Sequence, residues 1–247
     1  QMCIRDRYYK KVDSTLSWET MDGDVVRDWM VSMMEAGRTA TTVNRRLSAL
    51  RTFYRYLLRR DWIKVDPVRN IQGPKKKKPL PVFLKESEMN RLLDGDFFGN
   101  DFLGKRDKLI VNTFYVTGIR LSELTSLNNQ DVDMWGGVIR VTGKRNKQRI
   151  VPFGDELEAL LTAYLDEKSS LGLEDGGAMF VDEKGERLTN VKVRNLVRHY
   201  LGMVTTQKKR SPHVLRHTFA TSMLNHHADL ELSLIHISEP TRPISIS

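Results

Sequence analysis

The stretch IQGPKKKKPLP, residues 71–81, most constrains how this chain can fold. Gly73 and three prolines prevent a continuous helix, and the run of lysines after Pro74 repels itself. The sequence therefore predicts an extended, exposed basic linker over 72–82 between two globular segments. One interpretation of the lysine run is a solvated charge cluster. The other is a segment that follows a phosphate backbone through Lys75, Lys76, Lys77 and Lys78.

The segment before the linker, 8–71, has helical periodicity. Residues 22–37 begin with aspartates that can cap a helix and end at a glycine, with Val25, Trp29, Met30 and Met33 on one face. Residues 39–60 predict a longer helix with an apolar stripe. Its polar side is rich in arginine, and we expect Arg45, Arg51 and Arg55 to lie against DNA; a solvated basic face is the alternative.

The segment after the linker, 83–231, has a mixed pattern. Helical patterns cover 85–94, 104–116, 155–170, 189–204 and 211–224. Two β-rich arms around a turn predict a hairpin over 137–153, and residues 178–182 predict a short strand. The expected fold class is mainly α with a small β-sheet or hairpin, divided between a helical domain and a mixed α/β domain.

Composition narrows the class of partner. The 247 residues carry a net charge of +9 and a pI of about 9.6, which favours a polyanion such as nucleic acid. No apolar run is long enough to cross a bilayer, so we expect no membrane contact. The single cysteine, Cys3, excludes disulfides within the chain and cysteine-rich zinc sites, and a cytoplasmic setting is the default.

Three short motifs of the second segment combine into one chemistry. TGIRLSEL, 117–124, places Arg120 one helical turn before Glu123, which can hold the guanidinium. The hairpin tip GKRNKQR, 143–149, presents basic side chains, and SPHVLRH, 211–217, places a histidine and an arginine on one helical face. Taken singly, the three motifs have ordinary alternative interpretations: a surface ion pair, a solvated turn and a polar helix face. The basic side chains of the tip and helix are Lys144, Arg145, Lys147, Arg149, His213 and Arg216.

Together these residue types suit a phosphodiester in its transition state. Two arginines can clamp the charged non-bridging oxygens, a histidine can donate to the phosphate, and a lysine can protonate the leaving oxygen. Such a site needs no metal, and the chain has neither the carboxylate cluster of a two-metal nuclease nor a Walker loop. The pair His226 and His227 is not read as a metal site, because no further ligands stand at zinc spacing.

These motifs, in this order, resemble those of the tyrosine recombinases, most closely the Xer-type site-specific recombinases. Residues 39–57 resemble the helical core-binding domain of that family, and the likeness covers about Tyr8 to Glu231. The resemblance implies that Arg120 and Arg216 clamp the phosphate, Lys144 is the general acid, His213 belongs to the H-x-x-R motif, and Glu123 supports Arg120. Further contacts to DNA are expected from Arg145 and Lys147.

The resemblance also implies a reaction. A tyrosine attacks double-stranded DNA, forms a 3′-phosphotyrosine link and conserves the bond energy for rejoining, without a metal or other cofactor. The family acts as a homo- or hetero-tetramer, with a second recombinase, on paired sites, and chromosome-dimer resolution is the expected role. The alternatives are a phage or transposon integrase of the same family, a type IB topoisomerase, and a catalytically inert DNA-binding protein.

The end of the sequence departs from the family pattern. No tyrosine follows Tyr200, which precedes the H-x-x-R helix and is therefore out of order for a nucleophile. MCIRDR near the start, in residues 1–7, and the tail 232–247 resemble translated sequencing-adapter read-through; the alternative is a genuine short protein with an unusual tail. We expect a non-native leader and tail there, a truncation of both domains, and no strand cleavage by the chain as written.

Overall fold

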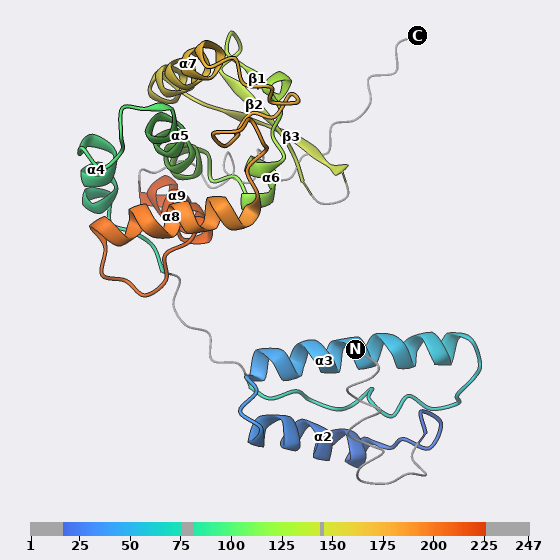
Figure 1. Cartoon of the computed structure of the whole chain (residues 1–247). Helices are drawn as coiled ribbons and strands as arrows, with labels where there is room; N and C mark the ends of the chain where they lie inside the picture. The colour runs from blue at the N-terminus through green and yellow to red at the C-terminus, as the bar shows by residue number, and fades with distance from the viewer. Residues whose placement is uncertain (1–16, 76–81, 144–145, 226–247) are drawn as a thin grey trace, which may run out of the picture. The chain divides into compact units, whose positions relative to one another are not determined.

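A computed structural model describes residues 17–75, 82–143 and 146–225 (Figure 1). The chain divides into two compact units, 1–79 and 80–247. In the described residues no helix combines the length and the apolar character that crossing a membrane requires.

In its described residues, 17–75, the smaller unit has two α-helices, α2 (Gly23–Glu35) and α3 (Ala40–Arg59). Asp22 caps α2 by accepting from the Val25 amide, and Thr39 caps α3 by accepting from the Thr42 amide. The apolar faces of both helices form one core, which the later residues Val68 and Ile71 complete. On α2 the sequence pattern missed Val26, which is fully buried, whereas Val25 lies at the edge of the core.

The larger unit is organised around α5 (Phe102–Thr117), which packs against α7 (Asp155–Ser170) and α9 (Pro212–Asn225) (Figure 1). Helix α4 (Glu86–Asp94) packs on α8 (Asn190–Val204), and α8 also contacts the short α6 (Leu121–Thr125). Leu109, Ile110, Val111 and Phe114 of α5 are fully buried, as expected for a helix surrounded by others.

A small antiparallel sheet completes the unit, with the order β1 (Val132–Asp133), β2 (Val138–Thr142) and β3 (Gln148–Pro152). The 3-10 turn η1 (Asn129–Asp131) leads into it. Strands β2 and β3 form the hairpin, with Val141 opposite Arg149 and Thr142 opposite Gln148. The fold class predicted from the sequence, mainly helical with a small sheet, is confirmed.

The strand expected over 178–182 does not form. Ala178 and Val181 instead make isolated bridges with Asn128 and Arg187. Backbone groups in this stretch are satisfied partly by side chains: the Tyr164 hydroxyl and the Lys168 ammonium both donate to the Met179 carbonyl, at 3.0 and 3.2 Å. Side-chain partners of this kind cannot be recognised from β-propensity.

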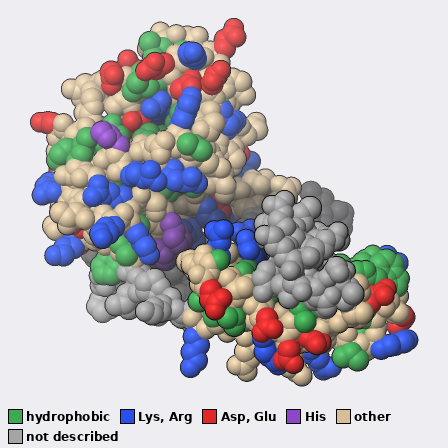
Figure 2. Space-filling view, turned by 60° about the horizontal axis from the view of Figure 1, so that its bottom comes forward, with side chains coloured by type: hydrophobic (Ala, Val, Ile, Leu, Met, Phe, Trp, Pro, Cys, Tyr) green, Lys and Arg blue, Asp and Glu red, His purple; other side chains and the backbone are tan. Residues whose placement is uncertain are grey.

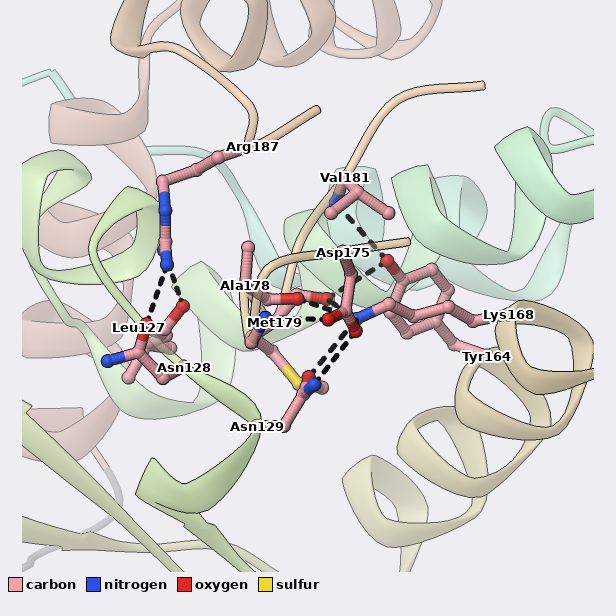
Figure 3. Close-up of polar contacts among 11 residues, drawn as sticks. Leu127, Asn128, Asn129, Tyr164, Lys168, Asp175, Ala178, Met179, Val181 and Arg187 are labelled. Atoms are coloured by element: carbon pink, nitrogen blue, oxygen red, sulfur yellow. Dashed lines mark hydrogen bonds and ion pairs between the residues drawn. The ribbon is translucent and has the colours of Figure 1, made fainter. Parts of the chain in front are cut away.

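Lys168 of α7 is the centre of a buried polar cluster (Figure 3). Its Nζ lies 2.7 Å from Asp175 Oδ2 and 3.1 Å from Asn129 Oδ1, and it donates to the Ala178 carbonyl at 2.5 Å. The hydrogen bonds from Lys168 and Asn129 lower the pKa of Asp175 to about 2. Together with Arg187, which donates to the Leu127 carbonyl at 2.7 Å, this cluster fixes the segment between α6 and β1.

Candidate active site

The site begins where α5 ends. Gly118 adopts φ +57° as the C-cap of α5, and a side chain at this position would overlap the ring of Phe219. Ile119 is then buried, and Arg120 is the N-cap of α6. The turn therefore fixes the backbone of Arg120 while its side chain remains 48% exposed.

Glu123 binds both the backbone amide and the guanidinium of Arg120. Its Oε2 accepts from the Arg120 amide at 2.7 Å, and its Oε1 accepts from Arg120 Nη1 at 2.8 Å. The Glu123 side chain is only 1% exposed, so this carboxylate is a rigid support. The predicted pairing of Glu123 with Arg120 is thus present in the geometry.

Arg149 of β3 also binds Glu123, an arrangement that the sequence reading missed. Its Nη1 and Nη2 donate to Oε1 and Oε2, each at 2.8 Å, in a two-pronged contact. Burial by itself would raise the pKa of Glu123, but the hydrogen bonds from Arg149 and Arg120 outweigh it and lower the pKa to about 2. The sequence predicted Arg149 only as part of a basic hairpin tip. Its position opposite Val141 in the hairpin gives no sign that it pairs with the buried Glu123 carboxylate.

Helix α9 brings Arg216 to the same place. Arg216 is half-buried, and its Nη1 donates to the Gly118 carbonyl at the end of α5. Burial, followed by the charges of Arg120 and Arg149, lowers the pKa of Arg216, although a guanidinium remains charged at neutral pH. Arg120 and Arg149 bind the Glu123 carboxylate, and Arg216 lies near enough for its pKa to respond to the charges of all three. Among these four described residues, three positive charges are therefore balanced by one negative charge.

His213 lies one turn before Arg216 on α9 and is exposed. Its Nε2 is 3.1 Å from Nε2 of His217, which the sequence analysis did not single out. Burial, followed by the neighbouring charges of His213 and Arg216, lowers the pKa of His217. One imidazole of the pair must donate and the other accept at this distance, so His217 is placed to influence the tautomer of His213.

The other predicted site residues belong partly to the larger unit and partly to the smaller one. Lys147 lies at the hairpin, where its carbonyl accepts from the Gly143 amide at 2.7 Å; Lys144 and Arg145 fall outside the described residues. On the smaller unit, Arg45, Arg55 and Lys75 are exposed, whereas Lys76, Lys77 and Lys78 are outside the described residues. Arg51 is half-buried and uses Nη2 to donate to the Ile71 carbonyl.

Figure 2 shows Lys and Arg side chains spread over the visible face of the larger unit, with His side chains among them. In the described part of the chain no group of three or more His, Cys, Asp or Glu residues could hold a metal ion. The pair His226 and His227 lies outside that part. The chemistry available in the described site is thus that of guanidiniums and imidazoles.

Tyr200 has the environment of a packing residue. Its ring stacks on Phe98 with centroids 4.3 Å apart. Burial and then the charge and hydrogen bond of Asp107 raise the pKa of Tyr200 to about 12. A phenol held in this way is disfavoured as a phenolate nucleophile.

Comparison with known proteins identifies the family. Residues 82–232 match the phage integrase family, and residues 6–61 match its N-terminal SAM-like domain. The chain belongs to the phage integrase family, whose members include the tyrosine recombinases.

The relatives are Xer-type, as the sequence motifs predict. Tyrosine recombinase XerC of Pelotomaculum thermopropionicum is 38% identical over 226 residues, covering 89% of this chain and 74% of the relative. Tyrosine recombinase XerD of Oceanobacillus iheyensis is 33% identical, covering 92% and 76%.

Solved structures show the same fold. XerA recombinase is 27% identical with a TM-score of 0.56, covering 92% of this chain and 77% of that one. XerH recombinase, bound to a palindromic difH substrate, has a TM-score of 0.76 at 22% identity, covering 94% and 69%. The XerH likeness concerns the fold alone.

Proposed function

We propose that this chain binds duplex DNA and supplies the phosphodiester-activating residues of site-specific recombination, a reaction that passes through a 3′-phosphotyrosine intermediate when a nucleophilic tyrosine is present. The observation that carries the proposal is the excess of guanidinium around one buried carboxylate. Glu123 neutralises one of the charges of Arg120, Arg149 and Arg216, and the exposed side of Arg120 is left for an anion. Oxygens that gain charge in the transition state are stabilised by donors fixed in advance in this way.

Each residue then has a role. Arg120 and Arg216 bind the non-bridging oxygens, and His213 donates to the phosphate or moves a proton. Lys144, proposed from the resemblance, protonates the leaving 5′ oxygen. Glu123 is a support, because its four hydrogen bonds are all made to protein donors. Arg45, Arg55, Lys75 and Lys147 contact the DNA backbone.

The chain as written is proposed to bind DNA without cleaving it. The resemblance requires a tyrosine after the H-x-x-R helix, and the sequence contains none after Tyr200. The stacking of Tyr200 on Phe98 supports its exclusion as a substitute.

The names of the relatives support an Xer-type recombinase. From the family resemblance we further propose a role in chromosome-dimer resolution, as a tetramer on paired sites in the cytoplasm. An integrase role would share the same chemistry. A plasmid that carries two copies of the bound site distinguishes the recombinase role from the role of a topoisomerase. The Xer role predicts deletion between the sites, whereas a topoisomerase relaxes a plasmid that has no site at all.

The test joins residues 1–225 to the C-terminal segment of the P. thermopropionicum relative, which supplies the missing tyrosine. A preferred duplex is first selected with the 247-residue chain from randomised DNA, and nicked duplexes of that sequence are offered to both proteins. We expect covalent trapping by this extended chain, none by the 247-residue chain, and none by the extended chain carrying Arg120→Ala. An extended chain that folds and binds the duplex without forming a covalent link would refute the proposal.

A further inference from the structure

The hairpin and α6 meet at one buried carboxylate. Arg149 approaches Glu123 from β3 with a side chain that is 20% exposed, and Arg120 approaches it from the start of α6. A carboxylate offers about four lone-pair sites, and four N–H groups donate to Glu123. Arg149 supplies two of these donors through its guanidinium, and Arg120 supplies the other two through its backbone amide and Nη1, so the two guanidiniums share the oxygen Oε1.

The turn end of the hairpin lies beside the same carboxylate. A Cβ at Gly143, the residue after β2, would lie 3.4 Å from Glu123 Oε1. The Gly143 amide donates to the Lys147 carbonyl at 2.7 Å and closes the turn there. Since Arg149 stands opposite Val141 in the ladder, the contact to Glu123 fixes both strands at the point where the turn begins.

We propose that Arg149 is a positioning residue that couples the β2–β3 hairpin to Arg120 through Glu123. This inference rests on the proposed function, in which Arg120 binds the scissile phosphate. Arg149 would not touch the phosphate, because both of its terminal nitrogens are directed at the carboxylate. Its effect would be to hold Arg120 and the hairpin in one fixed arrangement before DNA binds.

The first experiment uses the 247-residue chain and follows the Glu123 carboxyl by 13C NMR during an acid titration. Arg149→Lys retains the positive charge but cannot make the two-pronged contact. We expect the pKa of Glu123 to rise above its starting value of about 2 in Arg149→Lys, and further in Arg149→Gln. The matched control is Arg140→Gln, an exposed arginine on the neighbouring strand β2, which should leave this titration unchanged.

The second experiment measures single-turnover cleavage of prebound DNA by the extended chain. We expect Arg149→Lys to slow cleavage by about 10- to 100-fold, the cost of a misplaced catalytic group, with little change in DNA affinity. Arg140→Gln should cleave at the parent rate. A merely structural role would lower the melting temperature and the active fraction but would leave the rate of folded, bound molecules unchanged.

A further variant controls for the loss of folding stability that an unpaired buried charge causes. Glu123→Gln combined with Arg149→Gln removes both charges, so it should fold better than Arg149→Gln alone and yet remain slow in cleavage. Parent-level cleavage by Arg149→Lys or by the double variant would overturn the coupling. If the unmodified extended chain does not cleave, the proposed function fails, and an unchanged Glu123 titration in Arg149→Lys would still separately overturn the coupling.

Discussion

The described residues of the larger unit contain two buried ion-pair clusters, one centred on Glu123 and one on Lys168, which differ in charge balance. At Lys168, a buried cation is met by the Asp175 carboxylate, the Asn129 amide oxygen and backbone carbonyls, so its charge is matched (Figure 3). At Glu123, a buried anion is met by Arg120 and Arg149, with Arg216 nearby, so positive charge remains.

This difference in charge balance distinguishes a cluster that stabilises the fold from a cluster that can bind an anion. A matched cluster gains nothing from binding an outside ion, because its donors and acceptors are already used. An unmatched cluster with an exposed guanidinium lowers its own electrostatic energy when an anion binds. Buried ion pairs therefore become informative about function only when the charges around them are summed.

The largest effect that tests this comparison is on catalysis. Arg216→Ala in the extended chain should reduce cleavage by about 1,000-fold, because it removes a donor to the developing charge. Single-turnover trapping on the nicked duplex measures the rate. Lys168→Met should leave the rate per folded molecule unchanged, and an equal loss in both variants would erase the distinction between the clusters.

Acid should act on both clusters in the same direction. The folded pKa values of Glu123 and Asp175 are both about 2, below the ordinary value near 4, so their stabilisation is complete above the ordinary value and is lost as pH falls towards 2. Up to about 3 kcal/mol is lost at Glu123. Urea unfolding from pH 6 to 2.5 should show a shallower acid slope in Glu123→Gln, and a smaller change in Asp175→Asn, whose carboxylate is partly exposed.

Removal of the buried cation should cost stability alone. Lys168→Met removes the Lys168 donor from the Ala178 carbonyl and one of the donors to Asp175, which keeps its hydrogen bonds from Asn129 and the Gly177 amide. It should lower the free energy of unfolding by about 2–3 kcal/mol. Denaturant unfolding monitored by circular dichroism measures the change. Lys184→Met, at an exposed position, is the control, and an equal loss there would show that the cluster contributes nothing specific.

Gly118 connects the fold to the Glu123 cluster, since its carbonyl accepts from Arg216. Gly118→Ala should destabilise the chain by about 1–2 kcal/mol, because φ is positive and the added methyl meets the Phe219 ring. Thermal unfolding measures it. Gly172→Ala, which also has positive φ but open space, gives the cost of the backbone alone, and equal losses would remove the role of the Phe219 contact.

The smallest effect is expected at the rim. Lys147→Gln should reduce DNA affinity only slightly, but it should lower the slope of log affinity against log salt by about 1, as for one lost phosphate contact. Fluorescence anisotropy at several salt concentrations measures the slope with the 247-residue chain. Lys184→Gln serves as the comparison, and an unchanged slope in Lys147→Gln would place that residue away from the DNA.

The sequence by itself determined the helices, the hairpin and the local pairs, because each depends on residues close in the chain. Arg120 with Glu123 and His213 with Arg216 are set by the helical repeat, and the motif order predicted the family.

Only the tertiary structure decided which of these parts meet. Arg149 lies 26 residues from Glu123 and Arg216 lies 98 from Gly118, so neither contact has a local signal. Residues 178–182 form isolated bridges instead of a strand, and side chains from α7 satisfy the Met179 and Ala178 carbonyls there. Burial is the physical reason for these long-range contacts. When packing excludes water from a carboxylate, guanidiniums must supply the hydrogen bonds and the charge that water would otherwise supply.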